Sequence, residues 1–202
     1  MLSKLSVLMP FAFLISASPC LASGPAYATY GRGDKCFDKG LSPDDTIAVC
    51  QNAILGGLLD RGEVTAAYQN MGAAYMQKGD YPQAIKAFDY AIKWTPSLWQ
   101  AYANRGYLYS KMGQFDSALA DLNKAIELKP DEPVVYLRRG IAYERASKLA
   151  EAMADFDKML ELNPSYAEGL RYRGELKSQM GDTAGANADL AAAGAAEKNS
   201  KN

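Results

Sequence analysis

Apolar residues recur at helical spacing over the last two thirds of this 202-residue sequence. In the segment 84–92 the apolar residues are spaced three and four positions apart, and charged residues such as Lys86 and Asp89 lie between them. This spacing places the apolar side chains on one face of an amphipathic helix. Similar segments are separated by short turns around Gly79 and Gly113. The pattern therefore predicts an all-α fold of short helices joined by tight turns.

The helices follow a period of 34 residues. Each period contains a glycine, an alanine twelve positions later and a large apolar residue sixteen positions later, and the first three periods end with a proline. Small residues let two helices approach closely, and proline ends a helix because the residue before it resists the α conformation. A period of this length indicates stacked units that cannot bury their apolar faces alone. The positions concerned are Gly72, Gly106, Gly140 and Gly174; Ala84, Ala118, Ala152 and Ala186; Phe88, Leu122, Phe156 and Leu190; and Pro96, Pro130 and Pro164.

Two eight-residue segments recur in the first three periods. Residues 68–75 read Tyr-Gln-Asn-Met-Gly-Ala-Ala-Tyr and residues 81–88 read Tyr-Pro-Gln-Ala-Ile-Lys-Ala-Phe, with related segments one and two periods later. These segments resemble the tetratricopeptide repeat (TPR), a helix–turn–helix unit, and the resemblance extends from residue 65 to about residue 200. It implies a right-handed TPR solenoid in which pairs of helices stack on one another.

The fourth unit is degenerate. Lys177 replaces the expected tyrosine, no proline ends the unit, and 183–196 is rich in alanine. A polar, weakly packed last unit is what a solenoid needs for solubility. We therefore expect repeats at 65–98, 99–132 and 133–166, a degenerate repeat that acts as the C-terminal cap at 167–196, and a disordered tail at 197–202.

Residues 1–22 have the pattern of a secretory signal peptide. Lys4 is their only charge, the stretch 5–17 is almost wholly apolar, and small residues follow at cleavage spacing. The apolar stretch is too short, and too interrupted by Pro10, to span a bilayer comfortably. We therefore expect a cleaved signal peptide, a mature chain without a stable membrane span, and a periplasmic or secreted location. The alternatives are an uncleaved membrane anchor and lipidation of Cys20, although the residues before Cys20 lack the leucine that a bacterial lipobox favours.

Cys36 and Cys50 remain after cleavage, and an even number of cysteines in an exported protein favours a disulfide. Ser42 suits the N-cap of a helix over about 43–56, which carries Cys50, and the loop that holds Cys36 can fold back to it. Closing this loop would contribute about 3 kcal/mol; two buried thiols are the alternative. Segment 23–64 is therefore expected to hold a capping helix and a disulfide. The pattern of the two cysteines, leading into repeats, also resembles exported repeat proteins of alpha-proteobacteria.

The sequence contains no histidine. Its absence excludes the commonest general base, the serine–histidine and cysteine–histidine nucleophile systems and histidine-ligated zinc sites. No glycine-rich phosphate-binding loop is present, and acidic pairs such as Asp44 and Asp45 stand at helix starts, where they favour the helix dipole. The net charge of −1 gives no sign of nucleic-acid binding. We therefore expect a protein that is not an enzyme, holds no metal or cofactor and binds no nucleic acid.

The resemblance implies a concave groove lined by the first helix of each unit. In the register of the repeat, the positions that face it lie two and three before the glycine and one, four and five after it. Apolar and basic side chains combine there, which suits an extended or helical peptide with apolar anchors and some acidic character. The expected protein-binding residues are Gln69, Ala73 and Gln77 in the first unit, Asn104, Tyr107 and Lys111 in the second, Leu137, Arg138, Ile141 and Arg145 in the third, and Arg171 and Glu175 in the fourth.

Chaperone-binding members of the family hold a C-terminal carboxylate with a clamp of lysine, asparagine and arginine side chains. Gln69, Ala73 and Val134 occupy three of the clamp positions here, and only Asn104 and Arg138 match. A C-terminal carboxylate held in this way is therefore rejected as the ligand.

The resulting hypothesis is a non-catalytic protein–protein interaction scaffold of the bacterial envelope, which binds a peptide or a protein segment in the groove. Two alternatives stay open. One is an assembly factor that forms a homo-oligomer through exposed edge helices, above all 183–196. The other is a non-catalytic subunit of an envelope enzyme complex.

Overall fold

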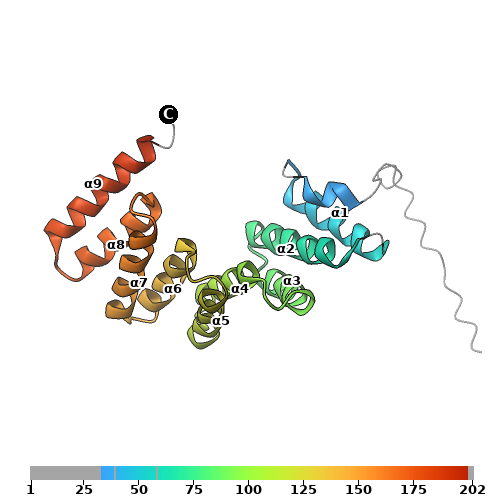
Figure 1. Cartoon of the computed structure of the whole chain (residues 1–202), viewed down its shortest axis with the longest axis horizontal. Coiled ribbons are helices and arrows are strands. Elements are labelled where there is room, and N and C mark those ends of the chain that lie inside the picture. The colour runs from blue at the N-terminus through green and yellow to red at the C-terminus, as the bar shows by residue number, and fades with distance from the viewer. Residues whose placement is uncertain (1–32, 39, 58, 200–202) are drawn as a thin grey trace, which may run out of the picture. The chain divides into compact units, whose positions relative to one another are not determined.

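A computed structural model describes residues 33–38, 40–57 and 59–199, so the expected signal peptide at 1–22 and the end of the expected tail at 200–202 lie outside the described residues. Within the described ranges the chain forms one 3₁₀-helix and nine α-helices, and no strand (Figure 1). The all-α prediction is confirmed. The elements are η1 (Gly33–Phe37), α1 (Pro43–Leu55), α2 (Arg61–Gln77), α3 (Tyr81–Trp94), α4 (Trp99–Lys111), α5 (Phe115–Leu128), α6 (Pro133–Arg145), α7 (Leu149–Leu162), α8 (Ala167–Gln179) and α9 (Thr183–Asn199).

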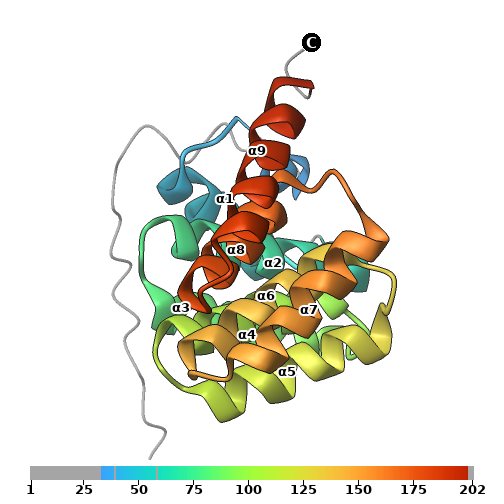
Figure 2. The ribbon, with the colours of Figure 1, turned by 90° about the vertical axis from the view of Figure 1, so that its left-hand side faces the viewer.

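The helices pack in consecutive pairs. α2 packs on α3, α4 on α5, α6 on α7 and α8 on α9, and each pair also contacts the next pair along the chain. We call α2, α4, α6 and α8 the first helices of the four units. The first helices α4 and α6 lie side by side (Figure 2), and α6 and α8 are also in contact. Among the described residues, no helix is both long and apolar enough to cross a bilayer.

Glycine in each first helix allows the two helices of a pair to approach closely. A Cβ atom on Gly140 would lie 2.5 Å from Cε1 of Phe156, and one on Gly72 would lie 2.6 Å from Cε1 of Phe88. Both distances are shorter than two non-bonded carbon atoms can approach, and both phenylalanine side chains are fully buried. Gly72 and Gly140 therefore stand where a ring from the second helix occupies the space of a side chain.

Left-handed residues end the first helices at the same place in each unit. Gly79, Gly113 and Gly181 have φ angles of 74°, 75° and 88°, and Ser147 takes the same place in the third unit with φ of 60°. Glycine adopts this conformation without steric cost, whereas a residue with a Cβ atom does not. The third turn is therefore the one where the repeat departs from its own pattern.

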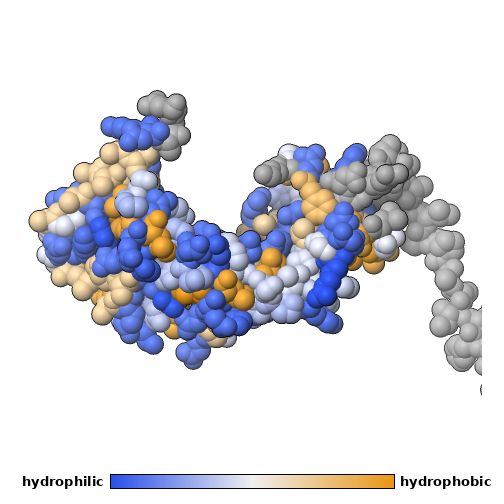
Figure 3. Space-filling model, viewed as in Figure 1, coloured by the Kyte–Doolittle hydropathy of each residue, from blue (hydrophilic) through white to orange (hydrophobic). Residues whose placement is uncertain are grey.

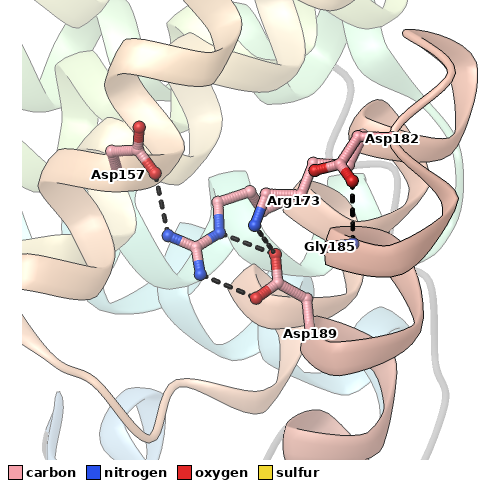
Figure 4. A network of polar contacts seen from close by, with 6 residues as sticks. Asp157, Arg173, Asp182, Gly185 and Asp189 are labelled. Atoms are coloured by element: carbon pink, nitrogen blue, oxygen red, sulfur yellow. Dashed lines mark hydrogen bonds and ion pairs between the residues drawn. The ribbon is translucent and has the colours of Figure 1, made fainter.

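A repeated set of arginine hydrogen bonds joins each of the last three units to the one before it. Arg173 donates two hydrogen bonds of 2.7 and 2.8 Å to Asp189 in the same unit and one of 2.8 Å to Asp157 in the preceding unit (Figure 4). Arg105 and Arg139 make the corresponding bonds in the second and third units. We call this set the arginine ladder; its members are Asp89, Arg105 and Asp121, then Asn123, Arg139 and Asp155, then Asp157, Arg173 and Asp189.

The degenerate fourth unit adds an ion pair to its part of the arginine ladder. Lys177, where the other units have tyrosine, forms a 2.8 Å ion pair with Asp189. Burial alone would raise the pKa of Asp189, but the hydrogen bonds from Arg173 and Lys177 outweigh burial and hold that pKa below its ordinary value. The hydrogen bonds to Asp189 and Asp157 raise the pKa of Arg173. Lys177, which makes the fourth unit atypical, therefore has a structural role where the third and fourth units meet.

The N-terminal segment packs against the first unit. Ser42 accepts a hydrogen bond from the backbone of Asp45 and so caps α1, which begins at Pro43 as expected. η1 lies against α1 and α2, and its Cys36 is at disulfide-bonding distance from Cys50, with 2.03 Å between the sulfur atoms. Asn70 of α2 donates a 2.9 Å hydrogen bond to the carbonyl oxygen of Cys36.

Two helices extend beyond the expected repeat boundaries. α2 begins at Arg61 rather than at residue 65, because Asp60 and Glu63 form a reciprocal capping box there. α9 continues to Asn199 and so includes 197–199, which the sequence analysis assigns to the disordered tail. The run of alanines in α9 explains the extension, since alanine has the highest helix propensity.

Candidate protein-binding surface

The twelve expected binding residues all lie on the first helices. α2 carries three of them, α4 three, α6 four and α8 two. We call the surface that these residues share the first-helix face. Contacts between α4 and α6 and between α6 and α8 bring the residues of the last three units together, while Ala73 and Gln77 of α2 line a hollow beside the N-terminal segment.

Arg138 of α6 stands at the centre of the first-helix face. Its Nη1 donates a 2.5 Å hydrogen bond to Oδ1 of Asn104 on α4. Its guanidinium lies 5.6 Å from the ring centroid of Tyr107, and the ammonium of Lys111 lies 5.7 Å from the same ring. Both distances suit a cation–π contact. Four of the expected residues therefore form one cluster on two neighbouring helices.

Arg138 has no anionic partner in the described part of the chain. Its one hydrogen-bond acceptor there is the neutral amide of Asn104, and no ion pair of the described residues includes it. Burial lowers the pKa of Arg138, and the partial compensation comes from Tyr107, Tyr166 and Glu168 nearby. A largely buried guanidinium with unused donors is a group that an incoming carboxylate would stabilise.

The part of the face that lies between α6 and α8 has mixed charge. Burial and the nearby carboxylate of Glu175 raise the pKa of Glu144, and Arg145 opposes that rise. Arg145, Arg171 and Glu175 are all exposed. This end of the face can contact a ligand of either charge, unlike the basic cluster around Arg138.

Two expected apolar anchors are buried in the protein itself. Leu137 and Ile141 are only 2% and 4% exposed and belong to a core cluster with Phe156 and Leu170. The described structure therefore leaves little of either side chain for a partner. Tyr107, which is half-buried, offers apolar surface beside Arg138.

At the first unit, the N-terminal segment covers part of the first-helix face. Asn70, Ala73 and Gln77 line a hollow of about 430 Å³ together with η1 and the residues that follow it. Gln69 is half-buried, whereas Ala73 and Gln77 are exposed. No repeat signal in 33–41 predicts this wall. The described residues contain no group of three or more acidic or cysteine side chains placed to hold a metal ion.

Comparison with protein families agrees with the geometry. Two sequence models described as "Tetratricopeptide repeat" match the chain, one over residues 71–139 and the other over residues 134–166. No curated protein gives a significant match. Residues 71–166 therefore carry tetratricopeptide repeats, as the sequence pattern predicted.

Solved structures with the same fold cover most of the chain. MamA from Desulfovibrio magneticus RS-1 is 22% identical, with a TM-score of 0.68 over 83% of this chain and 92% of its own. A thermophilic TPR protein of Thermus thermophilus is 20% identical, with a TM-score of 0.64 over 75% of this chain and 81% of its own. The predicted TPR solenoid is confirmed.

One similar structure contains a bound peptide. It is the first TPR domain of Spaghetti (RPAP3) bound to the HSP90 peptide SRMEEVD. It is 26% identical to this chain, with a TM-score of 0.55, and it covers 58% of this chain and 93% of its own. The fold that this chain shares with it is one that has bound an acidic peptide in that protein.

Proposed function

We propose that the protein is a non-catalytic scaffold whose first-helix face binds a segment of a partner protein. The observation that carries the proposal is Arg138, a largely buried cation whose hydrogen-bond partner among the described residues is a neutral amide. An acidic side chain of the partner would supply the missing negative charge, and an apolar or aromatic neighbour would pack on Tyr107. The peptide-bound TPR domain supports this mode of recognition.

The charge pattern around Arg138 favours an acidic segment. The ammonium of Lys111 lies over the same ring as the guanidinium of Arg138. These cations raise the local positive potential although the whole chain has a net charge of only −1. Specificity for acidic side chains is therefore a local property of this face.

The ligand that we propose is an internal acidic segment rather than a free C-terminus. Gln69, Ala73 and Val134 provide no cation at three of the positions that a carboxylate clamp uses, and only Asn104 and Arg138 match. Those two side chains already bond to each other. One guanidinium with one amide can hold a side-chain carboxylate, but it lacks the additional groups that would distinguish a chain terminus.

We further propose that the protein acts in the bacterial envelope, after export, with a disulfide between Cys36 and Cys50. The signal-like pattern of 1–22 supports export, and an even number of cysteines after cleavage suits an oxidising compartment. N-terminal sequencing of the protein from an envelope fraction tests the location of the protein and the cleavage of its signal peptide. A chain that retains residue 1 and stays in the cytoplasm would refute them.

The binding experiment compares Glu-containing peptides with their Gln counterparts. Twelve-residue labelled peptides, each with a central apolar residue flanked by Glu or by Gln, are titrated with the wild-type protein and followed by fluorescence anisotropy. The Glu peptides should bind more tightly, and Arg138→Gln should weaken them about tenfold or more, since hydrogen bonds to charged groups contribute roughly 1.5–3 kcal/mol.

Lys158→Gln is the matched control, because Lys158 is an exposed cation of α7 that pairs with Glu161 away from the first-helix face. It should bind the Glu peptides as the wild type does, and circular dichroism should show that both variants are folded. Equal binding of Glu and Gln peptides, or equal weakening by both variants, would refute the proposed site.

Self-association through α9 is a second candidate, and one observation favours it. Leu190 is 41% exposed, whereas its counterparts Phe88, Leu122 and Phe156 are fully buried. Figure 3 shows the alanine-rich α9 as a pale-orange, weakly apolar band, while elsewhere on this face hydrophilic and hydrophobic residues alternate. Light scattering over a range of protein concentrations tests it: the wild type should associate and Leu190→Glu should not. A wild type that is monomeric throughout would exclude this candidate.

A further inference from the structure

We call the contact between two neighbouring units a seam, and the contact between α1 and the first unit the first seam. The arginine ladder has no member at the first seam. One period before Asp89, Arg105 and Asp121, the sequence has Leu55, Met71 and Ala87. All three ladder positions are apolar there, whereas each later seam has an arginine that bonds to both sides. The first seam therefore lacks the side chain that fills the other three.

A hollow of about 330 Å³ lies at this seam. Leu55, Met71 and Ala87 line it, together with the rings of Tyr68, Tyr75 and Tyr90. We call it the first-seam hollow. Its rim includes two exposed apolar groups: Leu55 is 84% exposed and Tyr90 is 39% exposed. Its size is at the lower end of the range for ligand-binding pockets.

The equivalent tyrosines show what normally fills this space. In the second unit, the guanidinium of Arg105 lies 5.6 and 6.0 Å from the ring centroids of Tyr102 and Tyr109. In the first unit the two tyrosines are kept as Tyr68 and Tyr75, but methionine replaces the arginine between them. Tyr68 stacks on Tyr90 instead, with 4.9 Å between the ring centroids.

The charge at the first-seam hollow differs from that at the other seams. Among the described residues that line it, Lys86 alone is charged, and within the described part of the chain Lys86 forms no ion pair. Leu55 and Ala87 occupy the positions whose carboxylates hold Arg105 and Arg173 in later units. An incoming cation would therefore meet a like charge without a counter-ion, while an apolar group with an adjacent carboxylate would meet apolar walls and an ammonium.

The hollow lies away from the proposed peptide-binding face. On α2, Tyr68, Met71 and Tyr75 line the hollow, whereas Ala73 and Gln77 belong to the first-helix face. At 3.6 residues per turn these two sets lie on opposite sides of the helix. Occupation of one surface does not obstruct the other.

We propose that the first-seam hollow binds an apolar side chain of a partner protein, with an adjacent carboxylate of that partner paired to Lys86. The apolar side chain of the partner would pack against Leu55, Met71 and Ala87, and its negative carboxylate would face the positive ammonium of Lys86. The site goes beyond the proposed peptide-binding function and can stand or fall independently of it.

The test uses small probes that separate these contributions. The whole protein, labelled with ¹³C at its methionine methyl groups, is titrated with N-acetyl-phenylalanine, with its neutral amide, with N-acetyl-argininamide and with octanoate, and the Met71 resonance is followed. N-acetyl-phenylalanine should shift Met71 at the lowest concentration. The amide should bind about two- to fivefold more weakly, as expected for loss of an exposed ion pair, and argininamide should bind weakest.

Variants locate the site. Lys86→Gln should abolish the preference for the acid over the amide and leave binding of the amide unchanged. Leu55→Asp combined with Met71→Arg and Ala87→Asp copies the ladder of the second unit and should abolish binding of all probes. Leu55→Ser provides a milder change at an exposed position, where the fold does not depend on the side chain, and it should weaken every apolar probe.

Several results would overturn the proposal. They are strongest binding by argininamide, no shift of Met71 with any probe, affinities in Leu55→Ser equal to those of the wild type, and a preference for the acid over the amide that is unchanged in Lys86→Gln. Tighter binding of octanoate than of N-acetyl-phenylalanine would make the hollow a lipid site and would equally refute a protein side chain as its occupant. None of these results depends on Arg138, so failure here is distinguishable from failure of the proposed function.

Discussion

Arg138 and Arg139 are neighbours in α6, yet their guanidinium groups meet different surroundings. Arg139 donates two hydrogen bonds to Asp155 and one to Asn123. Arg138 lies about 100° further round the helix and reaches the neutral amide of Asn104. The same functional group therefore stabilises the fold at one position and stays available for an anion at the next.

Arg139→Ala should cost about 3–5 kcal/mol of unfolding free energy, because it leaves the Asp155 carboxylate buried without a cation. Lys158→Ala, which removes an exposed ion pair with Glu161, should cost about 1 kcal/mol or less. Urea unfolding of the two variants measures the difference. Similar losses in both would show that the ladder contributes no more than a surface pair.

Glu144→Gln should raise stability at neutral pH. Burial and the charge of Glu175 raise the pKa of Glu144 in the folded protein, so ionisation above its ordinary pKa costs folding free energy. The gain should vanish as the pH falls below that ordinary value, about 4.3, because Glu144 is then protonated in both states. Thermal unfolding at several pH values measures this, and Glu175→Gln should give a gain of the same sign. A loss of stability at neutral pH would contradict the argument.

At the scale of the elements, the four turns after the first helices show what glycine contributes. Ser147 has φ of 60° where the other units have glycine. A left-handed residue with a Cβ atom costs about 1–2 kcal/mol, and glycine loses about 0.5–1 kcal/mol through its unfolded-state entropy. Ser147→Gly should therefore stabilise the protein by about 0.5–1 kcal/mol, and Gly113→Ser should destabilise it by a similar amount. Chemical denaturation gives both values, and a change of the same sign in both variants would be inconsistent with this explanation.

The repeated elements could be predicted because their signals are local and periodic. Gly72 and Gly140 stand 34-residue multiples apart, and each is followed after sixteen positions by the ring that packs on it. The arginine ladder left a visible signal that the sequence analysis did not use: arginine precedes three of the four glycines, and aspartate follows each of those three after fifteen positions. Only the pairing of helices shows that these two positions meet.

The binding surface was less predictable. The repeat register shows which face of a helix a residue lies on, but it does not show how deeply the side chain is buried. Leu137 and Ile141 were expected to be open to a ligand, but they belong to the core cluster of the third and fourth units. η1 could not be foreseen as a wall beside Ala73 and Gln77, because its sequence has no repeat pattern and it meets α2 only through tertiary contacts. Tertiary packing, rather than local sequence, decides both points.

At the scale of the whole molecule, stability should be local because each unit contacts mainly its neighbours. Closing the loop from Cys36 to Cys50 is expected to contribute about 3 kcal/mol. Cys36→Ser combined with Cys50→Ser should therefore speed hydrogen exchange in η1, α1 and the start of α2 and leave α6 and α7 nearly unchanged. Hydrogen-exchange mass spectrometry measures this helix by helix.

Asn70→Ala is the control for that experiment. It removes one hydrogen bond to the carbonyl oxygen of Cys36, so its effect should be smaller, about 1 kcal/mol, and should lie in the same helices. Uniformly faster exchange along the whole chain would contradict a local, nearest-neighbour response, and unchanged exchange in η1 and α1 would show that the disulfide does not hold them.

The arginine ladder also determines how such a chain could grow. If residues 99–132 were duplicated in tandem, the arginine of the second copy would find an aspartate in its own unit and the amide counterpart of Asn123 in the unit before it. A duplicated 65–98 would instead place methionine beside Asp89 and leave that carboxylate without its arginine. The tandem copy of 99–132 should thus fold with a proportionally larger helical signal, and that of 65–98 should be less stable than the parent. Internal units are interchangeable, and the first unit can occupy only the beginning of the array.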